Sequence, residues 1–112
     1  MIHLNIGSNL NSKFGNKFDN ITIATKLLLE AGIKINKISN FYQTPSYPNQ
    51  THPKFLNVGI LVNFDKNCNE LIKKIKLIEK KMGRKKAKKN DPRIIDIDIV
   101  DFKKMIIKSK NL

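Results

Sequence analysis

The sequence predicts an α+β fold, a ferredoxin-like β-α-β-β-α-β sandwich in which two helices cover one face of an antiparallel sheet. Two kinds of apolar spacing lead to this prediction: alternation, which is typical of strands, and recurrence three and four residues apart, which is typical of helices. The segments with these patterns follow one another in the order strand, helix, strand, strand, helix, strand. The chain has 112 residues, which suits a single domain over 1–112 with one modest core.

The first half of this pattern precedes a proline-rich stretch. A strand is expected over 2–6, where apolar and polar residues alternate up to Gly7. A helix is expected from about Asn16, because apolar residues then recur at helical spacing until Gly32. The run KINKISNFYQT alternates again and predicts one further strand over 34–44.

The second half begins after a loop over 45–53, which contains three prolines. The nearly continuous apolar run over 55–64 predicts a central strand. One apolar stripe runs along 66–83 and predicts a helix that ends at the glycine. A basic loop over 84–92 then leads to the run RIIDIDIVDF, which predicts a strand over 93–102, and KKMIIKS predicts a short last strand.

The charge balance favours a polyanionic partner. The chain has 22 Lys and Arg against 9 Asp and Glu, a net charge of +13, which suits nucleic acid, an anionic membrane or a phosphorylated small molecule. Its richness in Lys, Asn and Ile has genome composition as a competing explanation. No apolar run approaches the roughly 20 residues of a membrane span. The N-terminus lacks the pattern of a signal peptide, and the single cysteine, Cys68, fits a reducing compartment, so a cytoplasmic location is expected.

Two carboxylates stand out in the run RIIDIDIV. Strand side chains alternate, so Asp96 and Asp98 share the face opposite to Ile95, Ile97 and Ile99. Carboxylates two residues apart on one face lie roughly 7 Å apart and repel each other. The pattern alone leaves two explanations open: an exposed sheet face that tolerates both charges, or a site for a hard cation such as Mg²⁺ together with substrate phosphates.

Three stretches in this order resemble one enzyme family. They are GSNL at 7–10, FYQTPSYPNQTHPKFLN at 41–57, and IEKKMGR leading into DPRIIDIDI over 78–99. Together they resemble 6-hydroxymethyl-7,8-dihydropterin pyrophosphokinase of the folate pathway. The resemblance covers essentially the whole chain and implies a ferredoxin-like core. It also implies Mg²⁺-dependent transfer of diphosphate from ATP to the hydroxymethyl group of the reduced pterin, releasing AMP, with two Mg²⁺ ions bound with ATP.

The resemblance also implies a role for individual residues. The two carboxylates would be metal ligands, the two arginines of the chain would contact phosphates, and Glu79 would lie near the nucleotide. The residues implied in catalysis are Arg84, Arg93, Asp96 and Asp98. The residues implied in the pterin pocket are Thr44, Pro45, Tyr47, Phe55 and Asn57.

Some residues have a plainer explanation from the sequence alone. Phe55 then reads as a core residue, and Glu79 as an exposed helix charge that pairs with a neighbouring lysine. Asn57 is harder to explain in this way, because a buried amide needs hydrogen-bond partners and the edge of a heterocycle provides them.

Other functions also remain open at this point. The resembled family continues beyond the point where this sequence ends, into a segment that supplies a second stacking aromatic and further ATP contacts. We therefore expect a fragment, a natural short form or a degenerate member, and a catalytically weak or inactive remnant is one alternative. A basic nucleic-acid-binding domain on the same fold is another, but Asp96 and Asp98 would place negative charge on the sheet face where phosphates would have to bind.

Overall fold

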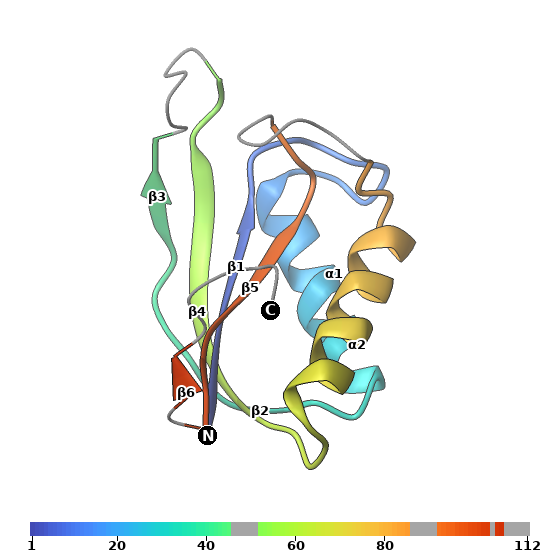
Figure 1. Cartoon of the computed structure of the whole chain (residues 1–112). Coiled ribbons are helices and arrows are strands. Elements are labelled where there is room, and N and C mark those ends of the chain that lie inside the picture. Colours follow the sequence, from blue (N-terminus) through green and yellow to red (C-terminus); the bar gives the residue numbers. More distant parts are fainter. Residues whose placement is uncertain (46–51, 86–91, 104, 107–112) are drawn as a thin grey trace.

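The computed structural model describes residues 1–45, 52–85, 92–103 and 105–106. These residues form an α+β fold with two helices and an antiparallel sheet (Figure 1), which confirms the predicted class. The elements, in order, are β1 (Ile2–Ser8), α1 (Lys17–Glu30), β2 (Lys34–Ile38), β3 (Tyr42–Thr44), β4 (Phe55–Asn63), α2 (Cys68–Lys81), β5 (Asp96–Phe102) and β6 (Met105–Ile106).

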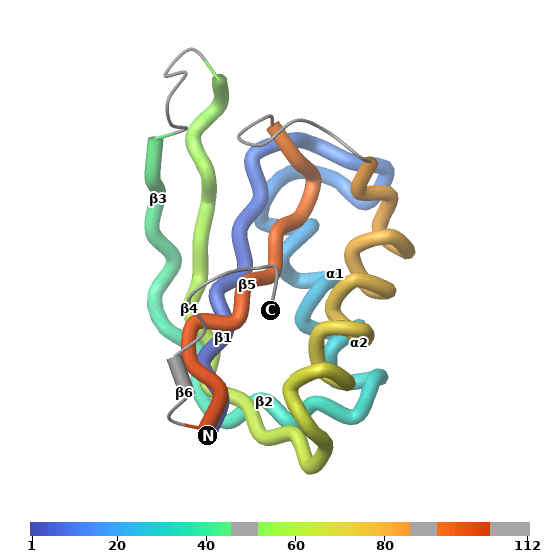
Figure 2. Tube along the Cα trace, viewed as in Figure 1, coloured from blue at the N-terminus to red at the C-terminus, as the bar shows by residue number. Residues whose placement is uncertain are grey.

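The strands of the described residues form one sheet in the order β2-β4-β1-β5-β6, and β3 also pairs with β4. Figure 2 shows β1 lying between β4 and β5, with β2 and β3 following one another along the far side of β4. All of these pairs are antiparallel. The register places Gly7 of β1 opposite Asn57 of β4 on one side and opposite Asp96 of β5 on the other. Three strands distant in sequence therefore meet at Gly7.

The core lies between the sheet and the helices, which cover the same face (Figure 1). Ile2, Leu4 and Ile6 of β1 are fully buried in it. Because strand side chains alternate, His3 and Asn5 lie on the opposite face, over which no described helix packs. We call this second face the open face of the sheet.

Both helices begin at an asparagine cap and are followed by the glycine at which the sequence predicted them to end. The side chain of Asn16 accepts a hydrogen bond from the backbone N–H of Asp19, and the side chain of Asp19 accepts one from the backbone N–H of Asn16. The side chain of Asn67 caps α2 in the same way as that of Asn16 caps α1, by accepting from the backbone of Glu70. Gly32 and Gly83 follow the helices with positive φ angles of 88° and 96°, a conformation that favours glycine. Among the described residues, no helix is both long and apolar enough to cross a membrane.

The single strand expected over 34–44 is wrong, because β2 and β3 are separate strands. At Ser39 the backbone N–H donates to the carbonyl of Gly59 over 2.8 Å, but Gly59 donates in return to the Ser39 hydroxyl, also over 2.8 Å. A side-chain oxygen thus takes the place of a backbone carbonyl. The regular ladder stops at Ile38 and resumes at Tyr42.

The strand expected over 93–102 starts later than predicted, at Asp96. The backbone of Arg93 pairs instead with Asn9 after β1: its N–H donates to Asn9 Oδ1 over 2.7 Å, and its carbonyl accepts from the Asn9 N–H over 3.1 Å. Arg93 is therefore fixed beside the end of β1 without being part of the sheet.

Candidate active site on the open face of the sheet

The open face brings together polar residues from the three central strands. Gly7 has Asn57 on one side and Asp96 on the other, and the next residue pair along β1 and β5 is Asn5 with Asp98. Gly7 places no side chain between its two polar neighbours. The prediction that both aspartates share one face is confirmed by this register, since each lies opposite a β1 residue of the open face.

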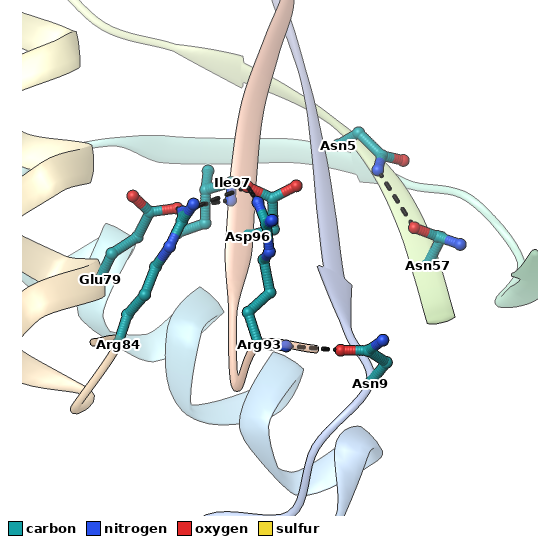
Figure 3. Close-up of polar contacts among 8 residues, drawn as sticks. All are labelled: Asn5, Asn9, Asn57, Glu79, Arg84, Arg93, Asp96 and Ile97. Carbon is teal, nitrogen blue, oxygen red and sulfur yellow. Dashed lines mark hydrogen bonds and ion pairs between the residues drawn. The ribbon is translucent and has the colours of Figure 1, made fainter. Parts of the chain in front are cut away.

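The carboxylate of Asp96 is neutralised by the two arginines. Its Oδ1 lies 3.2 Å from Nη1 of Arg84 and 3.8 Å from Nη1 of Arg93. Figure 3 shows both guanidinium groups directed at this carboxylate from the α2 side and from the start of β5. The sequence suggested an uncompensated repulsion between Asp96 and Asp98. The structure corrects this, because two positive charges balance the first of them.

Glu79 of α2 contacts this cluster from the side of the sheet that the helices cover. Its Oε2 accepts from Nη1 of Arg84 over 2.5 Å and from the backbone N–H of Ile97 over 2.9 Å (Figure 3). Only 8% of its surface is exposed. Burial raises the pKa of the Glu79 carboxyl above its ordinary value, against the opposing effects of the Ile97 hydrogen bond and the Arg84 charge.

The plainer explanation of Glu79 as an exposed helix charge is therefore wrong. Its side chain connects α2 to β5 and holds the guanidinium of Arg84 next to Asp96. A signal for this was present in the sequence, because Glu79 lies four residues after the buried Ile75 and belongs to the same helix face.

The opposite side of Gly7 carries the amide of Asn57, which is 7% exposed. Its Nδ2 donates to Oγ1 of Thr44 over 2.8 Å, and its Oδ1 accepts from Nδ2 of Asn5 over 3.4 Å (Figure 3). Phe55 lies two residues before Asn57 on the same face of β4 and is not part of the buried core. Core packing, the plainer explanation of Phe55, is therefore wrong.

The structure also places two further predicted residues and leaves one outside its described part. Pro45 is exposed just after β3, and Tyr47 lies outside the described residues. Asp98 is half-buried. Among the residues that the structure describes, no group of three or more His, Cys, Asp and Glu side chains is placed to hold a metal ion. A metal bound by Asp96 and Asp98 would thus need further oxygen ligands from water or substrate.

Sequence reasoning assigned no role in the site to three residues. Asn9, 1% exposed, holds the backbone of Arg93 through Oδ1 and donates from Nδ2 to the carbonyl of Pro53 over 3.1 Å. Asn5 and Tyr42 join the Asn57 network, with the Tyr42 hydroxyl donating to Asn5 Oδ1 over 2.8 Å. A polar residue directly after a strand, such as Asn9, is a signal that could have been used.

The sequence of this chain is similar to known proteins over nearly all of its length. The sequence model of the family described as "7,8-dihydro-6-hydroxymethylpterin-pyrophosphokinase (HPPK)" matches residues 3–111. The "2-amino-4-hydroxy-6-hydroxymethyldihydropteridine pyrophosphokinase" of Aquifex aeolicus is 34% identical over 113 residues, which cover 99% of this chain and 66% of that protein.

Two longer proteins are also similar to this chain. The "Folic acid synthesis protein FOL1" of Dictyostelium discoideum is 37% identical over 112 residues, which are 100% of this chain and 16% of that protein. The "Folate synthesis bifunctional protein, mitochondrial" of Arabidopsis thaliana is 34% identical over 103 residues, which are 92% of this chain and 19% of that protein. The chain thus spans less than a fifth of each of these two relatives. With a family match over nearly all of its residues, the chain belongs to the 7,8-dihydro-6-hydroxymethylpterin-pyrophosphokinase family.

Proposed function

We propose that this chain transfers diphosphate from ATP to the hydroxymethyl group of 6-hydroxymethyl-7,8-dihydropterin and releases AMP. The observation that carries the proposal is the arrangement around Gly7, with a buried amide on one side and the Asp96 carboxylate on the other. The two halves suit the two substrates: Asn57 offers hydrogen bonds to a heterocycle, and the aspartates with Arg84 and Arg93 suit a charged triphosphate. Family membership supports the same assignment.

The carboxylates of Asp96 and Asp98 fit Mg²⁺, because they present hard oxygen ligands from one face of a strand and leave positions for phosphate and water. Two Mg²⁺ ions would be held here with ATP, and their charge would offset that of the phosphates. Arg84 and Arg93 already lie within 4 Å of Asp96, so an incoming phosphate would find both positive charges beside the metal ligands. Glu79 would then contribute to nucleotide binding through Arg84, whose guanidinium it holds next to Asp96.

The pterin would bind over Gly7 and the neighbouring part of β4. Asn57 would hydrogen-bond the heterocycle, Phe55 would stack on its ring, and Thr44 would hold the Asn57 amide in place. Pro45 and Tyr47 would frame the same pocket. The substrates of this chain are then ATP and a reduced pterin. ATP would be the anionic partner of this chain of net charge +13, as an alternative to nucleic acid.

We also propose that the fold is ferredoxin-like. The strand order β2-β4-β1-β5 supports this, because the two helix-connected halves interleave in the sheet and both helices cover one face. The 1–112 stretch would then be one domain of that type.

Turnover of the chain tests the function directly. We expect AMP to form from ATP and 6-hydroxymethyl-7,8-dihydropterin, and we expect no AMP when the pterin or Mg²⁺ is omitted. Chromatography of the nucleotides measures both. If AMP does not form but Mg²⁺·ATP and the pterin both bind, the chain is an inactive remnant. Binding of neither substrate would contradict the proposal as a whole.

Gly7→Ala is expected to impair the pterin half of this site. An added Cβ would lie 2.7 Å from Oδ1 of Asn57 and 3.5 Å from Cδ1 of Phe55, so the Asn57 amide would have to move. We expect pterin affinity to fall by about tenfold, the equivalent of roughly 1.4 kcal/mol, because one well-placed hydrogen bond is lost. Calorimetric titration with the pterin measures this.

The matched control for Gly7→Ala is Gly59→Ala on the same face of β4. Its Cβ would meet Nε2 of His3 at 3.2 Å and would not contact Asn57. We expect the pterin affinity of this variant to stay close to that of the wild type. An equal loss in both variants would mean that the pterin does not bind over Gly7.

A further inference from the structure

Four polar side chains of the open face form one hydrogen-bonded network. The Tyr42 hydroxyl donates to Oδ1 of Asn5 over 2.8 Å. The amide of Asn5 then donates to Oδ1 of Asn57 over 3.4 Å (Figure 3), and the amide of Asn57 donates to Oγ1 of Thr44 over 2.8 Å. We call Tyr42, Asn5, Asn57 and Thr44 the open-face network. It begins and ends on β3 and crosses β4 to reach β1.

This network couples the orientation of the Asn57 amide to that of Asn5. If Asn57 alone turned over, its amino group would face the amino group of Asn5, and the hydrogen bond between them would be lost. Asn5 is hydrogen-bonded in turn to Tyr42, whose hydroxyl donates to the Asn5 oxygen, and if Asn5 alone turned over its oxygen would face the Asn57 oxygen, so the two amides turn over only together. Asn57 is 7% exposed, so little water is available to replace a lost bond.

The network leaves part of the Asn57 amide available. An amide nitrogen carries two donor hydrogens and an amide oxygen has two lone pairs. The network uses one hydrogen toward Thr44 and one lone pair toward Asn5, so one donor and one acceptor remain. Because the amide can turn over only together with Asn5, the order in which this donor and acceptor meet a ligand is coupled to Asn5 and its partner Tyr42.

We infer that Asn5 and Tyr42 are positioning residues that influence the specificity of the pterin site through the orientation of the Asn57 amide. This inference rests on the proposed function. Neither residue needs to touch the substrate. Tyr42 is the cleaner of the two to test, because β4 and β1 separate β3 from Asp96 and Asp98 on β5, whereas Asn5 lies directly opposite Asp98.

The test compares two heterocycles of nearly equal shape. In 6-hydroxymethylpterin the ring N3–H is a donor and the neighbouring 4-oxo group is an acceptor. In the 2,4-diamino analogue N3 is an acceptor and the 4-amino group is a donor. An amide that hydrogen-bonds to both of these positions must therefore turn over to bind the analogue in place of the pterin. We measure the Kd of each heterocycle by calorimetry, with Mg²⁺ and a non-hydrolysable ATP analogue present, for the wild type, Tyr42→Phe and Asn5→Ala.

We expect the wild type to prefer the pterin, and we expect this preference to fall about 3- to 10-fold in each variant, as the loss of one hydrogen bond implies. The matched control is Gln43→Ala. Gln43 is exposed between Tyr42 and Thr44, and because strand side chains alternate, its side chain lies on the face of β3 opposite to theirs. This variant should retain the wild-type preference. The affinity of Tyr42→Phe for the ATP analogue should also be unchanged.

Two results would overturn the inference. If Tyr42→Phe and Asn5→Ala weaken both heterocycles by the same factor, the two residues only support the local structure. If the wild type binds neither heterocycle, the proposed function fails, and the network is then judged by NMR of the Asn57 side-chain amide. Altered Asn57 amide signals in both variants would still support the network, whereas unchanged signals would contradict it.

Discussion

Asp98→Asn is expected to abolish diphosphate transfer while the fold stays intact. Loss of one proposed metal ligand should lower turnover by about 10³-fold, the equivalent of roughly 4 kcal/mol of transition-state stabilisation. Asp98 is half-buried on the open face, away from the packed core, so the free energy of unfolding should change by less than about 1 kcal/mol. The rate of AMP formation measures the first effect and urea unfolding the second, and titration with Mg²⁺·ATP should show that Mg²⁺-dependent ATP binding is lost as well.

Asp96→Asn should behave differently in one respect. It also removes a proposed metal ligand, so Mg²⁺-dependent ATP binding should be lost as in Asp98→Asn. Asp96 is, however, ion-paired with Arg84 and Arg93, whose side chains are 27% and 14% exposed, so its loss should also cost stability, by about 1 kcal/mol. Asp65→Asn changes an exposed carboxylate next to the end of β4 and serves as the matched control. ATP titrations like those of the wild type in both site variants would remove the metal site from the proposal.

Much of the fold follows from local patterns. The limits of both helices follow from apolar spacing and from caps such as Asn16 and Gly32, which act within a few residues. The shared face of Asp96 and Asp98 follows from strand alternation alone. The break between β2 and β3 does not, because it depends on Ser39 bonding to Gly59, a residue 20 positions away. Alternation continues through this break, so the pattern gave no sign of it.

The site was less predictable for the same physical reason. That Arg84 and Arg93 meet at Asp96 depends on how α2 packs against β5, and no spacing within either element determines this. The bond between Tyr42 and Asn5 joins residues 37 positions apart and depends on the register of three strands. The resemblance pointed to many of the site residues one by one, but only the packed structure reveals which of them hold one another.

Glu79→Ala is expected to have the largest effect on stability. It removes the acceptor for the Ile97 N–H and leaves that buried donor without its partner, which costs about 1–3 kcal/mol, and Arg84 loses its shortest ion pair. We expect a total loss of about 3 kcal/mol in the free energy of unfolding, a large share of the stability of a small domain. Glu79→Gln should be much milder, because its amide oxygen can still accept from Ile97. Urea unfolding compares the two variants, and a loss as large in Glu79→Gln would show that the charge, and not the acceptor, is what matters.

The pH dependence of unfolding separates the cost of burying the Glu79 charge from the benefit of its partners. Burial raises the pKa of Glu79 in the folded chain above 4.5, its ordinary value, so the folded state binds this proton more tightly than the unfolded state does. The resulting contribution to stability is fully present below the unfolded pKa and is lost as the pH rises through the folded pKa. The free energy of unfolding of the wild type minus that of Glu79→Gln should therefore decrease as the pH rises from the unfolded pKa of 4.5 through the raised folded pKa, with the other titrating groups cancelling in the difference. If this difference instead increases with pH, the attraction of Arg84 and the Ile97 hydrogen bond outweigh the desolvation of the carboxylate, and Glu79 is held as a stabilising anion.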